Sequence, residues 1–292
     1  MILETTTRLA LAFLWLLHFL PRPVIAGLGQ ALGTLLYHFG RGRVTKINLE
    51  LCFPELSEQE RDKLARKHFR ALGRSVLEQA ILWYGSDKQV LGMIKMVGRE
   101  NLDQHIGKPI IVLAPHFVGL DFGGACIGSE YRVCSMYSQQ KNKPLNKMLL
   151  RTRMRWGNPE LVTRQQGLRP LIKHIKNQLP FYYLPDMDFG RKESIFVPFF
   201  GVSTATVPAV SRLARLTGAV VIPCITRQLS PAEGYEVKIY PAWEKFPGDS
   251  IEEDTQRMNA FIEERVKEMP EQYFWVHKRF KTRPPGEKHF YK

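Results

Sequence analysis

Two apolar stretches open the chain, and a Pro-Arg-Pro break separates them. Only His18 interrupts the first stretch, LALAFLWLLHFL (residues 9–20), and a second stretch with several glycines covers residues 24–39. A helix that crosses a bilayer needs about 20 mostly apolar residues, so the first stretch is short unless its neighbours are included. The basic sequence RGRVTK follows, as in a cytoplasmic loop beside a membrane segment. We therefore expect residues 1–40 to form a hydrophobic membrane-anchoring helix at the inner face of a membrane.

Two other interpretations of this segment stay open. Runs of 10 to 14 apolar residues often form buried helices, so the segment can instead be a buried helical hairpin of a water-soluble protein. A secretory signal peptide would begin with a basic region and end in a small-residue cleavage site. Here Glu4 offsets Arg8, and residues 24–26 match a cleavage site poorly, which favours an uncleaved segment.

The middle of the chain begins with a helix signal. Residues 57–60 have the Ser-x-x-Glu form of a capping box, and apolar residues recur behind them at spacings of three and four. This pattern predicts an amphipathic helix that ends near Gly85. Short β-rich runs and helical patterns alternate beyond it. The predicted strands are residues 110–113, 133–137, 161–163, 181–184, 220–226 and 235–240, and the predicted helices are residues 145–155, 168–177 and 207–217. Such alternation predicts an α/β domain over residues 41–292, with helices on the faces of its sheet.

Composition constrains the partner and the compartment. The chain has 42 Lys and Arg residues against 28 Asp and Glu residues, a formal net charge of +14. Such an excess attracts an anionic partner, and nucleic acid, an acidic carrier protein and an anionic membrane surface all fit it. The four cysteines, Cys52, Cys126, Cys134 and Cys224, are widely spaced and form no C-x-x-C pair. We expect them to be reduced core residues of a cytoplasmic domain.

The strongest candidate for chemistry is His116, which follows the predicted strand 110–113 after Ala-Pro, where α/β folds present catalytic groups. Asp121 lies five positions further on. Within one helix the two side chains would be about 140° apart, so they meet only if His116 lies in a loop and Asp121 in the next helix's first turn. The carboxylate would then orient an imidazole that takes a proton from an alcohol. No Ser or Cys stands in a G-x-S-x-G sequence, so the alcohol would belong to a substrate. A structural histidine is the alternative.

Three more candidates follow predicted strands. Asp186 and Asp188 come after residues 181–184 and could bind a metal or orient a substrate, although no third and fourth metal ligands are evident. Two aspartates near a glycine can equally stabilise a turn through hydrogen bonds to its backbone. Arg164 comes after residues 161–163, and its guanidinium suits a phosphate group.

The C-terminal stretch WVHKRFKTRPPGEK (residues 275–288) mixes aromatic and basic side chains. Aromatic rings stack on bases and basic groups pair with phosphates, so a nucleic-acid arm is one interpretation. No recognisable nucleic-acid module accompanies the stretch. An interfacial or lipid-phosphate role agrees better with the apolar N-terminus, and we expect no nucleic-acid partner.

Several separated blocks of the chain resemble the late acyltransferases of lipid A biosynthesis, the lauroyl and myristoyl transferases of the lysophospholipid acyltransferase superfamily. Together with the apolar N-terminus they span most of the chain. The blocks are INLELCFPELSEQER (47–61), APHFVGLD (114–121), LPDMDFG (184–190), IFVPFFGVSTAT (195–206) and PEQYFWVHKRFKTRP (270–284). The resemblance implies a glycerolipid acyltransferase-like fold, with a mixed, mostly parallel sheet flanked by helices.

The resemblance also implies an activity: transfer of a fatty acyl group from acyl carrier protein to a hydroxyl of a lipid A precursor, at the cytoplasmic side of the bacterial inner membrane. His116 would be the general base and Asp121 its orienting partner. The hydroxyl would attack the thioester directly, without an acyl-enzyme, a metal or another cofactor. Arg164 would contact the acceptor's phosphate or position substrate, and Asp186 and Asp188 would organise the site.

Departures from the family pattern limit what can be carried over. Many members have Glu in place of Asp121, so neither an acyl chain length nor an acceptor is assigned to this chain through that residue. Glycerolipid-directed members usually have a Glu-Gly-Thr motif after the His block, which is absent here, so lysophospholipid acylation is the weaker alternative. Two other classes stay open: a membrane-associated hydrolase with a metal held by Asp186, Asp188 and His116, and a non-catalytic basic binder. Both leave the block pattern unexplained.

Overall fold

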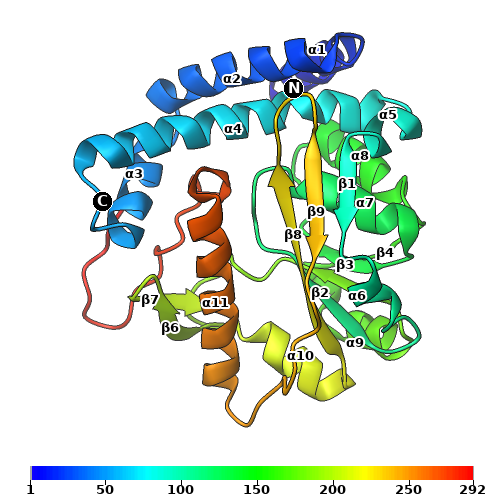
Figure 1. Ribbon diagram of the computed structural model, residues 1–292, viewed down its shortest axis with the longest axis vertical. Coiled ribbons are helices and arrows are strands. Elements are labelled where there is room, and N and C mark those ends of the chain that lie inside the picture. The colour runs from blue at the N-terminus through cyan, green and yellow to red at the C-terminus, as the bar shows by residue number, and fades with distance from the viewer. Residues whose placement is uncertain (1, 292) are drawn as a thin grey trace.

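The strand Ile110–Leu113, labelled β2, consists of aliphatic residues whose side chains are all buried, as expected for a strand covered on both faces. In the computed structural model, which describes residues 2–291, it is the central strand of seven (Figure 1). In spatial order these are β1 (Ile94–Val97), β9 (Tyr235–Ile239), β8 (Val220–Gln228), β2, β5 (Phe181–Tyr183), β3 (Cys134–Tyr137) and β4 (Glu160–Thr163). Within this seven-stranded sheet, only β8 and β9 pair antiparallel. The prediction of a mixed, mostly parallel sheet is confirmed.

Helices cover both faces of this sheet. The helices of the described residues are α1 (Ile2–Leu17), α2 (Arg22–Phe39), α3 (Gly42–Cys52), α4 (Glu58–Tyr84), α5 (Asp87–Leu91), α6 (Glu100–Asp103), α7 (Leu120–Glu130), α8 (Lys143–Met154), α9 (Arg169–Lys176), α10 (Ala209–Thr217) and α11 (Ile251–Glu268), with short 3-10 turns η1 (Arg164–Gln166) and η2 (Pro270–Gln272). Alternate side chains of β2 point to opposite faces of the sheet and pack against the helices on each face. Ile110 and Val112 pack with side chains of α7, whereas Ile111 and Leu113 pack with α9, α10 and α11.

The predicted elements agree closely with the observed ones. All six predicted strands and the three helices between them exist, with ends shifted by one or two residues. The capping-box helix is α4: the Ser57 hydroxyl accepts from the Glu60 N–H, and the helix ends at Gly85. Strand β1, helix α11 and the antiparallel hairpin of β6 (Ile195–Phe199) and β7 (Val202–Thr206) were not predicted.

The N-terminal segment forms two helices, not one. α1 and α2 lie along the outer side of α4, at the top of the molecule in Figure 1. Helices α2 and α4 approach closely because glycines meet at their crossing: a Cβ on Gly33 would lie 2.0 Å from the Phe69 carbonyl oxygen, and a Cβ on Gly73 would lie 2.3 Å from the Gly29 carbonyl oxygen. Only glycine allows this backbone contact.

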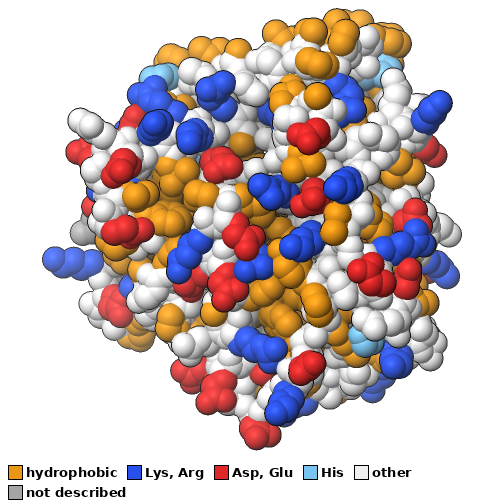
Figure 2. Space-filling view, viewed as in Figure 1, with side chains coloured by type: hydrophobic (Ala, Val, Ile, Leu, Met, Phe, Trp, Pro, Cys, Tyr) orange, Lys and Arg blue, Asp and Glu red, His pale blue; other side chains and the backbone are white. Residues whose placement is uncertain are grey.

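Large apolar side chains of α1 and α2 point to solvent. Phe39 is 87% exposed, Leu9 66% and Leu16 58%, and Figure 2 shows apolar side chains along this edge of the molecule. The interpretation as a buried hairpin is therefore wrong for these side chains. Among residues 2–291, none of the helices is long and apolar enough to cross a membrane. The segment therefore forms a helix pair with an exposed apolar surface and not the expected single helix, and its anchoring role stays a prediction.

The glycine contact between α2 and α4 makes a testable prediction. Gly33→Ala should lower the free energy of unfolding by about 1–3 kcal/mol, because the new methyl group must push the helix backbones apart. Gly27→Ala is the matched control, since a Cβ there meets nothing within 4 Å. Helix propensity should make this control equal to or up to about 1 kcal/mol more stable than the wild type. Thermal or denaturant unfolding followed by circular dichroism measures both. Equal stability of the two variants would contradict the close crossing.

Candidate active site

Two adjacent parallel strands carry the central pair of the site, His116 and Asp186. The register of β2 and β5 sets Leu113 opposite Tyr183, and each functional residue lies three positions further on. Because the carboxyl ends of parallel strands meet at one edge of a sheet, the two side chains come together. His116 Nδ1 lies 2.7 Å from Asp186 Oδ1, and the His116 N–H donates to both carboxylate oxygens, at 3.2 and 3.1 Å.

The buried carboxylate of Asp186 fixes the state of the histidine. Asp186 is only 2% exposed. Burial raises the pKa of its carboxyl group, but His116 and then the positive charge of Arg279 act against burial and bring the pKa below its ordinary value. Because the carboxylate only accepts hydrogen bonds, Nδ1 of His116 must carry the proton. Nε2 is then available as a base, and it has no hydrogen-bond partner in the part of the chain that the structure describes.

Asp121 does not make the expected contact with His116. It is exposed in the first turn of α7, where the helix dipole favours a carboxylate, and its Oδ2 accepts from Gln79 Nε2 of α4 at 3.0 Å. The orienting partner of His116 is thus Asp186, and the predicted pairing with Asp121 is corrected. The reason is geometric: the β2–β5 register brings Asp186 to Nδ1, whereas α7 directs Asp121 toward Gln79. Both Asp121 and His116 line the same cavity, so a part for Asp121 in catalysis stays a prediction.

The turn before α7 is held from α4. Gly119 has a left-handed backbone (φ 85°), and its N–H donates to the Ser75 hydroxyl at 3.1 Å. A Cβ at Gly119 would lie 2.3 Å from the Tyr235 ring, so only glycine fits. Sequence analysis missed Ser75 and Gln79, because nothing in the amphipathic pattern of α4 separates them from other polar helix residues.

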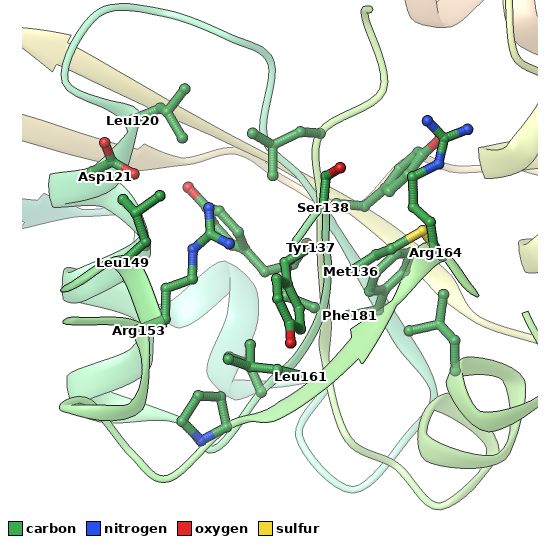
Figure 3. A pocket seen from close by; sticks show the side chains of 18 of the residues that line it. Leu120, Asp121, Met136, Tyr137, Ser138, Leu149, Arg153, Leu161, Arg164 and Phe181 are labelled. Atoms are coloured by element: carbon green, nitrogen blue, oxygen red, sulfur yellow. The ribbon is translucent and has the colours of Figure 1, made fainter. Parts of the chain in front are cut away.

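A cavity of about 750 Å³ adjoins His116, within the range of small-molecule sites. One face of α7 forms a wall, with Asp121, Gly124, Ala125 and Gly128 at helical spacing. Figure 3 shows Asp121 and Arg164 at opposite sides of this cavity, with Met136 of β3 between them. Further lining comes from Leu82 and Trp83 of α4, Leu149 and Arg153 of α8, Trp156, and Phe181 and Tyr182 of β5. The cavity is therefore mostly apolar, with charged side chains at opposite sides, and it suits a ligand that has a long apolar part.

Arg164 lies at the cavity where its strand ends, as predicted. It begins η1 directly after β4, and its guanidinium sits 4.5 Å from the Phe189 ring centroid. Its Nη2 is 3.7 Å from Glu193 Oε2, and both side chains are about half exposed. Such a pair contributes little to stability, so an anionic ligand could displace Glu193 at small cost.

Asp188 points to the C-terminal segment and not into the cavity. Its Oδ1 accepts from the Gly190 N–H (2.9 Å) and the Thr282 hydroxyl (2.8 Å), and its Oδ2 accepts from the Thr282 N–H (2.7 Å). The Asp188 N–H donates to Nε2 of His277 at 3.0 Å. Burial first, and then the charge of Arg279, lower the pKa of His277 to about 4, so this ring is neutral. The predicted role of Asp188 in organising the site therefore takes the form of a structural brace.

The same C-terminal segment braces the loop of His116. The Phe274 N–H donates to the His116 carbonyl (3.0 Å), and the Val118 N–H donates to the Gln272 carbonyl (2.7 Å). Asn48 of α3 holds the segment from its other side by donating to the Trp275 carbonyl (2.7 Å). Two sequence blocks that lie far from His116 in the chain therefore fix the backbone around it.

The predicted interfacial or lipid-phosphate role of the C-terminal stretch is wrong for three of its side chains. Trp275 is fully buried, and Arg279 and Arg283 are 2% and 6% exposed. Arg279 donates to the Ala205 carbonyl at 2.8 Å, and Arg283 donates to the Ser203 carbonyl. These two arginines therefore bind backbone carbonyls of the β6–β7 hairpin and not the lipid phosphates that were expected.

The cysteines occupy the core. All four are buried and free, as predicted, and burial raises the pKa of Cys126 and Cys134 to about 12. They are thus protonated thiols at neutral pH. Within residues 2–291, no group of three or more His, Cys, Asp or Glu side chains could hold a metal ion.

A histidine held by a buried aspartate at the carboxyl edge of a parallel sheet, beside an apolar cavity, is typical of α/β enzymes that act on hydrophobic substrates. Comparison with known proteins gives the family. The family model described as bacterial lipid A biosynthesis acyltransferase matches residues 2–282. The chain belongs to this family of acyltransferases.

Three relatives from Escherichia coli (strain K12) illustrate the range of names in the family. Lipid A biosynthesis lauroyltransferase is 34% identical, covering 96% of this chain and 92% of the relative. Lipid A biosynthesis palmitoleoyltransferase is also 34% identical, over 98% and 94%. Lipid A biosynthesis myristoyltransferase is 31% identical, over 92% and 84%. Because relatives named for three different acyl groups are nearly equally identical to this chain, sequence similarity does not show which acyl group this protein transfers.

The contrast between Asp186 and Asp188 makes a prediction about rate. Asp186→Asn should lower kcat for acyl transfer by about 10² to 10⁴, because the amide permits the wrong tautomer of His116. Asp188→Asn is the matched control: it makes the same charge change two residues away, at a carboxylate that holds Thr282. This control should lose stability but keep kcat within about tenfold. Steady-state kinetics at several pH values measure both, and equal losses of kcat would contradict the assigned roles.

Proposed function

We propose that this protein transfers a fatty acyl group from acyl carrier protein to a hydroxyl of a lipid A precursor, with His116 as general base. Family membership supplies the class of reaction and acceptor. The observation that carries the mechanism is the 2.7 Å contact between His116 Nδ1 and buried Asp186. In the neutral ring this contact puts the proton on Nδ1 and makes Nε2 the basic atom, and His116 lines the cavity, where a substrate hydroxyl can reach it.

The proposed reaction needs no group on the enzyme to form a covalent bond. Nε2 of His116 takes the proton as the hydroxyl oxygen attacks the thioester carbonyl carbon. The tetrahedral intermediate then breaks its carbon–sulfur bond, and the leaving thiolate of the carrier receives the proton back from the imidazolium. Asp186 stabilises that imidazolium through Nδ1. The exposed carboxylate of Asp121, on the wall of the same cavity, would add to this stabilisation through its charge.

The wall of α7 supports a place for the acyl chain. Gly124, Ala125 and Gly128 follow Asp121 along one face, and small side chains leave room for a ligand beside the helix. Gly128 lies about 10 Å along the axis from Asp121, at 1.5 Å per residue. Trp156 packs at that end, since a Cβ on Gly128 would meet the Trp156 Cβ at 3.0 Å. We place the acyl chain along α7, with its far end toward Trp156.

Arginines at the cavity support recognition of an anionic acceptor. Arg164 has only a loose partner in Glu193, and Arg153 of α8 lies on the opposite wall, with its guanidinium 6.0 Å from the Tyr137 ring centroid. A lipid A precursor presents phosphate groups, which arginine binds through paired N–H donors. The formal charge of +14 would also attract an acidic carrier protein.

The exposed apolar side chains of α1 and α2 support attachment to the bilayer. None of the helices within residues 2–291 is long and apolar enough to cross a membrane, so we propose that this pair lies in the interface. Since acyl carrier protein would be the donor, the surface concerned is the cytoplasmic side of the inner membrane. Such attachment would bring the cavity to a lipid acceptor that stays in the bilayer.

The experiment that tests the proposed function uses purified protein in detergent, acyl carrier protein loaded with one fatty acid, and an under-acylated lipid A precursor. Mass spectrometry should show the acceptor heavier by one acyl group. His116→Ala should lower the rate by at least about 10³, because base and imidazolium are both lost. Lysophosphatidic acid serves as the control acceptor. A rate near that of the wild type for His116→Ala, or a preference for the control acceptor, would contradict the proposal.

Placement of the acyl chain along α7 predicts a change of chain preference. Ala125→Phe should fill the cavity where the chain passes, so longer acyl donors should lose kcat/KM more than shorter ones, by about tenfold or more. Competition between acyl carrier proteins that carry chains of 10 to 16 carbons, read by mass spectrometry, measures this ratio. Because a ratio is compared within one variant, general loss of folded protein does not alter it. Uniform loss across all chains would place the acyl group elsewhere.

A further inference from the structure

A second cavity lies between helices α2 and α4, away from the active site. Its volume is about 430 Å³, and it shares no lining residue with the catalytic cavity. The residues that line it are Gly27, Gln30, Ala31, Thr34 and Tyr37 of α2 and Arg66 and Arg70 of α4. We call it the α2–α4 groove. The proposed acyl transfer does not use it.

The groove has an excess of positive charge. Asp62 is shared by Lys46 (2.7 Å) and Arg66 (2.8 Å), and the Tyr37 hydroxyl also donates to it. Arg70 donates to the neutral side chain of Gln30 at 2.8 Å, and no carboxylate within residues 2–291 forms an ion pair with it. Three cations therefore face one carboxylate, which leaves two positive charges in excess. Arg66 and Arg70 are exposed and one helical turn apart, so their free N–H groups can meet one ligand.

The groove adjoins the apolar surface of α2. At 100° per residue, the exposed side chains of Val24, Leu28, Leu35 and Phe39 fall within a sector of about 60° around the helix axis. Residues 27, 31 and 34, which line the groove, occupy the next sector of about 60°. Figure 2 shows basic side chains directly below the apolar upper edge of the molecule. If that edge enters the membrane interface, the two arginines lie at the level of lipid headgroups.

We propose that the α2–α4 groove binds the phosphate of a lipid headgroup, held by Arg66 and Arg70, while the acyl chains of that lipid lie beside the apolar side chains of α2. Arginine presents paired N–H donors that match phosphate oxygens. The small residues on the α2 side leave space for the headgroup: a Cβ on Gly27 meets nothing within 4 Å. The phosphate can come from an anionic phospholipid of the bilayer or from a phosphorylated glycolipid acceptor, because both offer the same group.

The test measures binding of the full-length protein to vesicles by flotation. One set of vesicles contains phosphatidylglycerol in phosphatidylcholine, and the other contains phosphatidylcholine alone. Arg66→Gln with Arg70→Gln removes the two groove arginines. Lys63→Gln with Lys67→Gln is the matched control, since it has the same spacing on α4 and the same charge change, at exposed residues that do not line the groove. Gly27→Leu fills the groove without changing any charge.

The arginine pair should lower binding to phosphatidylglycerol vesicles by about tenfold, and the lysine pair by about threefold at most, because general attraction is screened by salt. Gly27→Leu should lower this binding by about fivefold and leave binding to phosphatidylcholine vesicles unchanged or stronger. Circular dichroism and thermal unfolding check that each variant is folded. Equal losses in the two double variants, or unaltered binding of Gly27→Leu, would overturn the proposal.

A second arm identifies the source of the phosphate. Phosphatidylcholine vesicles are doped with the phosphorylated acceptor or with the same acceptor after enzymatic removal of its phosphates. If the arginine pair weakens binding only to phosphatidylglycerol vesicles, the groove takes a bulk phospholipid. If it weakens binding only to the phosphorylated acceptor, the groove takes the substrate lipid. Either result supports a lipid-phosphate site, and a lack of response in both arms contradicts it. Since binding is measured without turnover, the outcome does not depend on the proposed acyl transfer.

Discussion

The site depends on an ionised carboxylate that is kept out of water. Asp186 is buried, and such a group stays charged only when hydrogen bonds and positive charge compensate the loss of hydration. His116 supplies hydrogen bonds from its ring and its backbone, and Arg279 supplies charge. The C-terminal segment carries Arg279 and also bonds to the His116 loop. The sheet edge, the histidine and the end of the chain therefore form one connected unit.

Sequence patterns predicted the α/β core well, because its strands are short apolar runs and α4 carries a capping box. They missed β6 and β7, where Pro198 and a run of Ser and Thr residues weaken the strand pattern, although the pair buries Val197 and Thr204. They showed the Pro-Arg-Pro break between α1 and α2, although a single anchoring helix was expected, but not how α2 packs on α4. Backbone contact between Gly33 and Phe69 depends on a partner helix far along the chain, so local hydropathy holds no trace of it.

Sequence analysis predicted the residues of the candidate site but paired His116 with the wrong carboxylate. His116 and Asp186 were each placed after a strand, and Arg164 was placed at the cavity, yet proximity in sequence favoured Asp121 as the partner of His116. The missing information was the neighbour relation of β2 and β5 in the sheet, which sequence order does not reveal. Asp188 and the C-terminal arginines were assigned to ligands because charged residues are rarely buried, whereas here each has a protein partner.

The central claim is that Asp186, and not Asp121, fixes the tautomer of His116. Nuclear magnetic resonance of protein labelled with ¹⁵N-histidine measures this directly, with the ring signals assigned from His116→Gln. At a pH where the ring is neutral, the account predicts its proton on Nδ1, shifted downfield by the hydrogen bond, and none on Nε2. This pattern should persist in Asp121→Asn and disappear in Asp186→Asn. A neutral ring with its proton on Nε2 in the wild type, or loss of the Nδ1 signal in Asp121→Asn alone, would contradict the account.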